Sequence, residues 1–467
     1  MLNKTLIALT LALTPLAFAQ DGAKVFKAGA SLSNITPWIG TSLAGSMADR
    51  KATRINDELY VRSFVMDDGA TTLSISLVDS CMVERPIIDA AKERASPATG
   101  ITTTNMLVAA THSHSAGTCA TIFQSKPDPE FTTFVSRRIA DGITRAWQNR
   151  VPARIGWASG SVPDEVFNRR WYVQEGKVGT NPFGKIDTIQ TNPASDTIIK
   201  PAGPTDSEVA FIALETIDGK PLGLLANYSL HYVGGTKGTD VSADYFGRFS
   251  EEIGRLLGAD DRFLAMLSNG TSGDINNINF VTPRGPRKPY EQMDIVAKKV
   301  AAEVYRASLT IEFHDWVPLK SAQTEVTLGV RKPTTEEVAE AKTILAAAEG
   351  RALKGMREIY ANETVKMAAF PDTKTLIIQA FQVGNLGIAA IPCEVFVDTG
   401  LAIKAQSPFA QSFTIELANG YNGYLPTEEQ HGYGGYETWR AASSYLEVKA
   451  ADVVQKTVLE LLASLKE

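Results

Sequence analysis

Residues 108–118, VAATHSHSAGT, join an apolar run to two histidines that stand one residue apart. The chain of 467 residues has five histidines in all, so two of them at one loop are unusual. On an extended backbone, residues at i and i+2 share one face, so His112 and His114 would point the same way, whereas on a helix they would not. The stretch therefore predicts a strand of a central sheet that ends in a loop carrying chemically useful groups.

The same arrangement recurs at four other places in the chain. Each time, a run of apolar residues ends in a loop of small or polar residues, the pattern of a buried strand and its turn. Polar groups gathered at strand ends along one sheet edge are the usual geometry of an α/β active site. The four runs are LLANYSL before His231, FLAML before SNGTSGDINN (268–277), LGIAAIP before Cys393 and Glu394, and FTIELANG before Tyr421 and Tyr424.

Strand-like and helix-like segments alternate along the whole chain, and no internal repeat interrupts them. This predicts an α/β (α+β) fold in which mixed central β-sheets are flanked by helices. Segment 334–363 reads as one long helical stretch with Thr334 or Thr335 as its N-cap, and 180–207 reads as an extended loop over the site. The other expected helices are 129–149, 245–258, 291–308 and 451–465, and the expected strands include 71–80, 105–111, 208–217, 221–230 and 376–384.

The first 19 residues have the pattern of a secretory signal peptide. Lys4 is followed by an apolar run from Leu6 to Leu16, and Ala17-Phe18-Ala19 fits the small-x-small cleavage rule. The apolar run is too short to span a bilayer comfortably. We therefore expect a mature protein that starts near Gln20 and is secreted or periplasmic.

Composition is that of a globular protein, with 44% hydrophobic and 21% charged residues. The net charge is −6, and no long basic run is present, which argues against a nucleic-acid partner. Only three cysteines occur, Cys81, Cys119 and Cys393. One disulfide and three buried thiols are both compatible with this count.

Metal chemistry is the first interpretation of the His-x-His pair. Zinc binds histidine nitrogen and carboxylate oxygen in a roughly tetrahedral shell, so a ligand must come from elsewhere in the chain. His231 and Glu394 are the best candidates, although a lone histidine is often a hydrogen-bonded core residue and a lone glutamate a structural ion pair. His314 is interpreted as structural, and His431 as facing the substrate. Loop 268–277 could present an oxyanion hole through its backbone N–H groups, but its composition favours an ordinary tight turn.

Seven segments in order along the chain resemble the neutral/alkaline ceramidase family, secreted zinc amidases that cleave the N-acyl bond of ceramide. No single segment is decisive, but their order is hard to produce by chance. They are GASLSNITPWIGTSLAGSM (29–47), ATHSHSAG (110–117), FNRRWY (167–172), SLHYVGG (229–235) with SADYFG (242–247), SNGTSGDINN (268–277), IPCEVFVDTG (391–400) and LANGYNGYLPTEEQHGYGGYE (417–437).

The resemblance implies zinc ligands at His112, His231, Glu394 and Tyr424. A tyrosine ligand is chemically reasonable, because a nearby Zn²⁺ would lower the phenol pKa from about 10. The resemblance implies that His114 is not a ligand and either supports the ligands or faces the substrate. By its place in the sequence, it is also the best candidate to carry a proton to the leaving amine. It also implies one catalytic domain over residues 20–467, without the C-terminal domain that many family members have.

Three further residues receive roles from the resemblance. Arg169 and Tyr436 would stabilise the oxyanion. Asn276 stands where the family has a serine thought to take part in catalysis, and an asparagine can donate a hydrogen bond but is no nucleophile. Independently of the resemblance, Asp244 would orient a ligand histidine, as carboxylates near metal ligands often do. The family's His-Pro is here His231-Tyr232.

The expected function is hydrolysis of an N-acyl amide, of ceramide or a related small-molecule or lipid substrate, by zinc-activated water. A lipid substrate leaves room for peripheral contact with a membrane surface. Two alternatives stay open: a zinc-binding relative without turnover, and a hydrolase of another amide or an ester. A two-metal phosphoesterase is a weaker interpretation, because the ligand set has few aspartates.

Overall fold

A large mixed sheet forms the centre of the protein in the computed structural model, which describes residues 24–466. The predicted signal peptide lies outside these residues. Parallel pairs stand at both edges of the sheet, β14 with β16 and β6 with β7, and the neighbours between them are antiparallel. The strand order is β16 (Leu264–Asn269), β14 (Pro221–Tyr228), β13 (Glu208–Thr216), β8 (Val151–Ser161), β1 (Lys27–Asn34), β5 (Tyr60–Asp67), β6 (Thr72–Val78) and β7 (Met106–Ala110).

A second, four-stranded sheet packs on the first. Apolar side chains from both sheets, among them Ile75, Ile212 and Phe381, form the core between them. Burying such side chains is the main stabilising contribution, at about 25 cal/mol per Å² of apolar surface. The strands of the second sheet are β18 (Leu319–Gly329), β19 (Thr373–Val383), β20 (Leu386–Ile391) and β22 (Gln411–Glu416).

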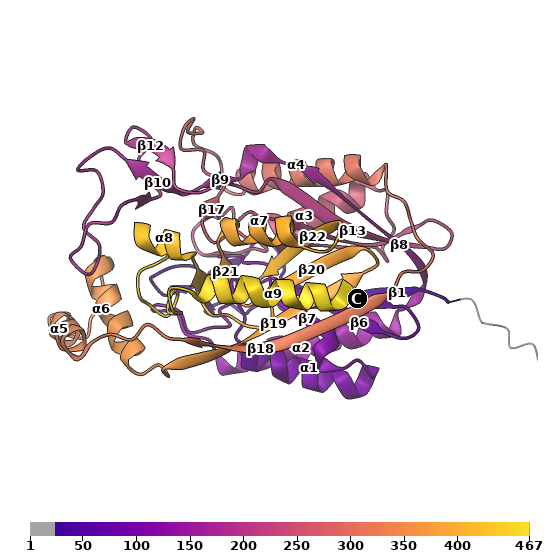
Figure 1. The fold of residues 1–467 in the computed structure, drawn as a ribbon, viewed down its shortest axis with the longest axis horizontal. Helices are drawn as coiled ribbons and strands as arrows, with labels where there is room; N and C mark the ends of the chain where they lie inside the picture. The colour runs from indigo at the N-terminus through magenta and orange to yellow at the C-terminus, as the bar shows by residue number, and fades with distance from the viewer. Residues whose placement is uncertain (1–23, 467) are drawn as a thin grey trace, which may run out of the picture.

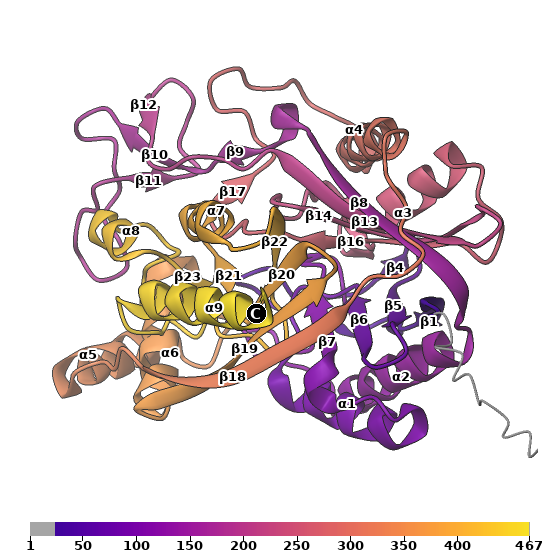
Figure 2. The ribbon, with the colours of Figure 1, turned by 45° about the vertical axis from the view of Figure 1, so that its right-hand side comes forward.

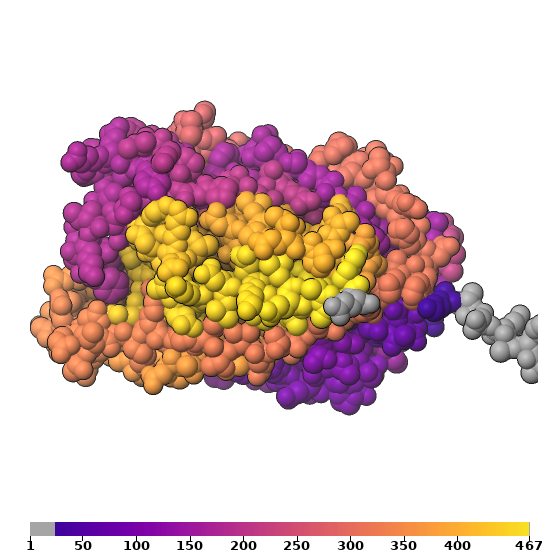
Figure 3. Space-filling model, in the orientation of Figure 1, coloured from indigo at the N-terminus to yellow at the C-terminus, as the bar shows by residue number. Residues whose placement is uncertain are grey.

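Helices cover the outer faces of both sheets (Figures 1 and 2). On the face seen in Figure 3, the C-terminal segment fills the centre between magenta residues above and orange residues below. Helices α1 (Arg85–Thr99) and α2 (Pro129–Gln148) lie under the β1–β5–β6 half of the large sheet, α3 (Asp244–Leu256) and α4 (Glu291–Ser308) cover its β8–β13–β16 half, and α7 (Val397–Gln406) and α9 (Ala450–Lys466) cover the second sheet.

The carboxyl ends of strands from both sheets meet in the middle of the molecule. The chain after β22 pairs with β7, where the N–H of Asn419 donates to the carbonyl of Val108 at 2.7 Å. From β14, the amide of Asn227 donates to the carbonyl of Thr414 in β22 at 3.0 Å. Two short parallel strands, β21 (Glu394–Val395) and β23 (Tyr424–Leu425), continue the junction. This junction brings the predicted strand-end loops together.

The expected α/β architecture is confirmed, and four of the five expected helices begin and end within two residues of the predicted positions. The stretch 334–363 is the exception, since it forms two helices, α5 (Thr335–Ala346) and α6 (Gly355–Ala368). After α5, Glu349 and Gly350 have positive φ, and so does Gly355 at the first position of α6, so the backbone leaves the helical path between the two helices. Thr334 is the N-cap and forms a capping box with Glu337.

The segment 180–207 is not a plain loop. Its short strands β11 (Gln190–Thr191) and β12 (Ile198–Pro201) pair on either side of β10 (Arg170–Val173). Of the two states open to the cysteines, the structure has three buried thiols. Among residues 24–466, none of the helices combines the length and apolar character that crossing a bilayer requires.

Candidate metal centre and active-site cavity

Two of the strand-end histidines face each other through their Nε2 atoms. His112 follows β7 and His231 follows β14, and their Nε2 atoms are 2.9 Å apart. The Nδ1 atom of His112 is 2.8 Å from the carbonyl oxygen of Cys81, and that of His231 is 3.1 Å from the carbonyl oxygen of Ser272. A carbonyl only accepts, so each Nδ1 carries the proton and each Nε2 keeps its lone pair.

His114 adds a third imidazole with the same orientation. Its Nδ1 is 3.0 Å from the carbonyl oxygen of Gly45, and its Nε2 is 3.1 Å from Nε2 of His112. The ring stacks on Tyr232 with 3.6 Å between centroids and 13° between planes. His114 is thus held beside the two facing histidines with a lone pair turned toward them.

Glu394 completes the cluster from β21. Its Oε2 is 3.4 Å from Nε2 of His112 and 3.9 Å from Nε2 of His231. This oxygen is buried and has no hydrogen-bond partner among residues 24–466, while Oε1 accepts from the hydroxyl of Tyr421 at 3.0 Å. Pairing of β21 with β23 aligns Glu394 with Tyr424.

The facing lone pairs and the buried carboxylate together favour the binding of a cation. Two facing lone pairs repel, and an unpartnered buried carboxylate oxygen is costly. The ligand atoms of His112, His231 and Glu394 lie within 4.8 Å of one another, close enough to share one metal ion. Imidazole nitrogen and carboxylate oxygen suit Zn²⁺ among other divalent ions. The residues therefore fit the metal that the sequence predicted. The ligand atoms of a second group, Cys81, His112 and His114, also lie within 4.8 Å of one another.

Electrostatics of the cluster agree with this role. Burial lowers the pKa values of His231 and His114, so both imidazoles stay neutral, as metal ligands must. Burial opposes ionisation of Glu394, but His112, Arg169 and Tyr424 together outweigh it and lower the pKa of that carboxyl. Burial alone would lower the pKa of His112, yet Cys81 and Glu394 raise it well above its usual value. The surroundings of His112 thus favour one positive charge at its Nε2, which a proton supplies when no metal is bound and which a metal ion would replace.

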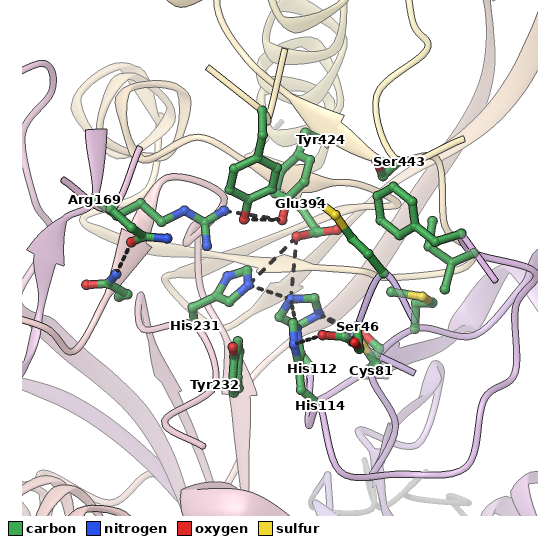
Figure 4. A pocket seen from close by; sticks show the side chains of 18 of the residues that line it. Ser46, Cys81, His112, His114, Arg169, His231, Tyr232, Glu394, Tyr424 and Ser443 are labelled. Atoms are coloured by element: carbon green, nitrogen blue, oxygen red, sulfur yellow. Dashed lines mark hydrogen bonds and ion pairs between the residues drawn. The ribbon is translucent and has the colours of Figure 1, made fainter. Parts of the chain in front are cut away.

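Arg169 extends from the chain after β9 (Phe167–Asn168) to the other side of the cluster, as Figure 4 shows. Its Nε donates to Glu437 at 2.9 Å, and its Nη2 donates to the carbonyl of Gly273 at 2.6 Å and to the hydroxyl of Tyr424 at 3.2 Å. Nη1 has no protein partner among residues 24–466. Burial opposes the charge on Arg169, but Tyr436, Tyr424 and Glu437 keep its pKa well above its ordinary value. The side chain therefore offers a fixed, charged donor to the cavity.

These groups line one cavity of ≈ 230 Å³. Tyr436 belongs to it, and its hydroxyl lies 3.2 Å from that of Tyr424. In Figure 4, Arg169 stands on one side of the row of histidines and Glu394, and Ser46 and Ser443 stand on the other. The lining includes Met47, Met82, Ile122 and Phe123 as apolar side chains, and Asn192, Asn276 and Asn277 as amides.

Asn276 lies in the cavity wall, in the short strand β17 (Ile275–Asn276) that pairs with β9. Its Nδ2 donates to Asn192 at 2.8 Å, and its Oδ1 accepts from the N–H of Ile278 at 2.9 Å. One amide hydrogen is left for a ligand. The loop before it turns carbonyls toward the site: that of Ser272 meets His231, and that of Gly273 meets Arg169. These contacts match the tight turn that the composition favoured.

Two predicted roles are wrong. The Asp244 carboxylate accepts from the backbone N–H groups of Val233, Gly234 and Tyr245, so it fixes the loop after His231 and does not contact the imidazole. His431 lies in α8 (Glu428–Tyr433) and does not line the cavity, so it does not face a substrate there.

His314 forms a backbone bridge with Ile155, and its ring lies 5.1 Å from that of Trp157 at a tilt of 33°, as its structural interpretation expected. Sequence reasoning missed Tyr232 and Glu437 as site residues. Both directly follow a predicted site residue in the chain, but neither carries a pattern that reveals its contacts.

Comparison with solved structures identifies proteins that share the fold of this chain. No protein-family model matches the chain. Among solved structures, the neutral ceramidase from Pseudomonas aeruginosa superposes with a TM-score of 0.71, at 17% sequence identity over 95% of this chain and 75% of that one. The chain has the fold of neutral ceramidase. A ceramidase complexed with C2 matches with the same score, identity and coverage. In this chain, the neutral ceramidase fold thus brings three potential metal ligands, His112, His231 and Glu394, together at the junction of its two sheets.

Proposed function

We propose that this chain is a secreted or periplasmic zinc-dependent hydrolase that cleaves the N-acyl amide bond of ceramide or a related N-acyl lipid. Residues 20–467 would form its single catalytic domain. The observation that carries the proposal is the convergence of three lone-pair nitrogens and an unpartnered carboxylate oxygen, next to Arg169, in a neutral ceramidase fold.

His112, His231, Glu394 and Tyr424 would hold the metal. Bound Zn²⁺ would polarise the scissile carbonyl and lower the pKa of water to about 7. Burial raises the pKa of Tyr424 well above its usual value, so this phenol would act as a ligand only beside a cation.

The remaining residues have defined tasks in amide hydrolysis. Water adds to the carbonyl carbon, the C–N bond breaks, and the products are a carboxylic acid and an amine. His114 Nε2 would take a proton from the water and return it to the leaving nitrogen. Nη1 of Arg169 and the hydroxyl of Tyr436 would donate to the developing oxyanion, and the second amide hydrogen of Asn276 would add a third donor.

A direct assay tests the proposal. The purified protein is incubated with a fluorescent short-chain ceramide, with chelator, and with chelator followed by zinc. We expect amide cleavage that chelator abolishes and zinc restores, and we expect none from H231A. Cleavage that survives complete metal removal would refute the proposal.

A second function rests on Asn276. The family's serine is missing at this position, and the hydroxyl of Ser272 is buried and donates to Glu416 at 2.7 Å. A zinc-binding relative that binds an N-acyl lipid without cleaving it would show saturable, zinc-dependent binding of the same ceramide and no product.

A further inference from the structure

Phe123 lines the cavity and has an unusual backbone conformation. The N–H of Ile122 donates to the carbonyl of Ser125 at 3.2 Å and the reverse bond is 3.0 Å, so Phe123 and Gln124 form the centre of a two-residue turn. Phe123 has φ +49° at the first central position, which glycine usually takes when only that residue has positive φ. A bulky residue in such a conformation is costly, and such residues concentrate at functional sites.

Three contacts fix this turn to the rest of the protein. Lys366 in α6 donates to the carbonyl of Phe123. Gln124 donates through Nε2 to the carbonyl of Met47 at 3.0 Å, and its Oε1 accepts from the N–H of Leu353 at 3.3 Å. The turn is therefore attached both to the cavity wall and to the segment before α6. The phenyl ring is held in place as part of that wall.

A second cavity lies behind the ring. The Phe123 ring meets that of Tyr360 edge to face at 6.3 Å, and Tyr360 meets Phe183 at 6.0 Å and Trp439 at 5.4 Å. Phe183 and Tyr360 line a cavity of ≈ 520 Å³ between residues 180–184 and the α5–α6 pair, which lie together at the left end of Figure 1. This aromatic cluster thus separates the small cavity at the metal centre from a larger one.

The small cavity is divided by polarity. Asn192 and Asn276 are hydrogen-bonded to each other, and the N–H of Asn192 donates to the carbonyl of Arg169, so these amides lie on the Arg169 side. Met47 follows Ser46 on the opposite side and packs in the same cluster as Phe123. An amide bond at the metal centre would have hydrogen-bonding groups on one side and apolar groups on the other.

We propose that Phe123 sets the length of the acyl chain that this site accepts, an inference that rests on the proposed amidase function. The substrate class is an N-acyl amine with a hydrogen-bonding amine part against the asparagines and a short acyl chain against Met47, Met82 and Phe123. A cavity of ≈ 230 Å³ is below the range of about 300–1,000 Å³ for drug-sized ligands, so a long chain does not fit within it. The larger cavity would take a longer chain once the ring is removed.

Turnover and binding are measured over one series of chain lengths. N-acylethanolamines with acyl chains from two to sixteen carbons serve as substrates for the zinc-loaded protein, and amine release gives kcat/KM. The free fatty acids of the same lengths serve as binding probes by calorimetry. Each additional buried methylene raises the affinity or kcat/KM roughly fourfold. In the wild type, this increase should stop at a definite acyl-chain length.

In F123A the gain should continue past that length. Four carbons beyond the wild-type limit, the ratio of F123A to wild type should be on the order of 10². F123L keeps part of the ring volume and should give an intermediate limit if F123A folds poorly. F183A is the matched control, because Phe183 lines only the larger cavity, and its limit should equal that of the wild type.

The outcomes separate this inference from the proposed function. If no substrate is cleaved but the fatty-acid limit still moves in F123A, the amidase proposal fails and the role of Phe123 stands. If substrates are cleaved and the limit is the same in wild type, F123A and F123L, the role of Phe123 is refuted. Fatty acids that do not bind any variant, together with an unchanged turnover series, refute it as well.

Discussion

Replacing Glu437 by glutamine should both destabilise the protein and disable Arg169. The Glu437 carboxylate is fully buried and accepts from Arg169 Nε at 2.9 Å, from Arg170 Nη1 at 2.8 Å and from Thr191 Oγ1 at 2.9 Å. Both guanidinium groups are buried as well, with side chains 4% and 0% exposed. Glutamine keeps the volume, removes the charge, and turns an N–H group toward one of the donors.

The expected cost follows from leaving buried charge without its partner. Removing one member of a buried ion pair typically costs about 3–5 kcal/mol. Here one carboxylate serves two arginines, so we expect the free energy of unfolding to fall by at least about 3 kcal/mol. Arg169 would also lose the bond that orients its free Nη1. Loss of one oxyanion donor lowers kcat by a factor of about 10²–10³, and we expect a similar loss of ceramide cleavage.

Urea unfolding of wild type and E437Q measures the stability, and E340Q is the matched control. Glu340 pairs with Arg357 at 3.8 Å, with side chains 70% and 72% exposed, and such surface pairs contribute about 0–1 kcal/mol. Zinc content is measured on each variant and should be the same, because Glu437 does not contact His112, His231 or Glu394, the three clustered candidate ligands. Equal unfolding midpoints for E437Q and E340Q would refute the reasoning.

Three further predictions concern the metal, the loop under His114 and a buried lysine. H112A and H231A should each bind less than about a tenth of the zinc that the wild type binds, measured by elemental analysis. Zinc at a concentration of 1,000 times its Kd should raise the free energy of unfolding of the wild type by about 4 kcal/mol. Equal zinc content in the variants and the wild type would contradict the ligand assignment. G45A should lose at least about tenfold in activity, because its Cβ would lie 2.3 Å from the His114 ring. Gly40 has a similar positive φ with nothing within 4 Å, so the control G40A should lose only stability. Equal activities of G45A and G40A would contradict this. Burial lowers the pKa of Lys92 to about 8, so the folded state binds fewer protons than the unfolded state between pH 8 and about 10.4. The free energy of unfolding measured with urea should therefore rise with pH over that range by about 3 kcal/mol relative to K92M. Parallel pH curves for the wild type and K92M would contradict this.

The sequence predicted the parts of the fold that depend on local pattern. Strand β7 was predictable because its five residues are all buried, so it reads as an uninterrupted apolar run. Helix α4 matched its predicted bounds because apolar residues recur along one face. The α5–α6 break was missed because helical spacing continues through residues 347–354, whereas the structure has positive φ at Glu349 and Gly350 and an extended backbone at Lys354.

The candidate site was predictable only as a set of strand ends. His112, His231 and Glu394 were found because each follows an apolar run. Their distances depend on pairing between β7 and the chain after β22, where Ala109 lies opposite Ala418. This pairing joins segments about 300 residues apart and leaves no local signal. The bond between Arg169 and Glu437 spans 268 residues. Asp244 was given the wrong role because an acidic residue near a histidine shows nothing of which donors surround it.

The arrangement around Arg169 favours turnover over passive metal storage. A site that only holds a cation would gain nothing from a second positive charge nearby, because the two repel and both are buried. The chain nevertheless holds Arg169 with Glu437 and two further acceptors, and within the described residues 24–466 its Nη1 has no protein partner. A carbonyl oxygen between the metal and Nη1 would be stabilised by both charges most strongly once it becomes an oxyanion, so the gain is greater in the transition state than in the bound substrate. The asparagine at position 276 does not remove this difference, because the difference depends on the cation and on Arg169 and not on a nucleophilic side chain.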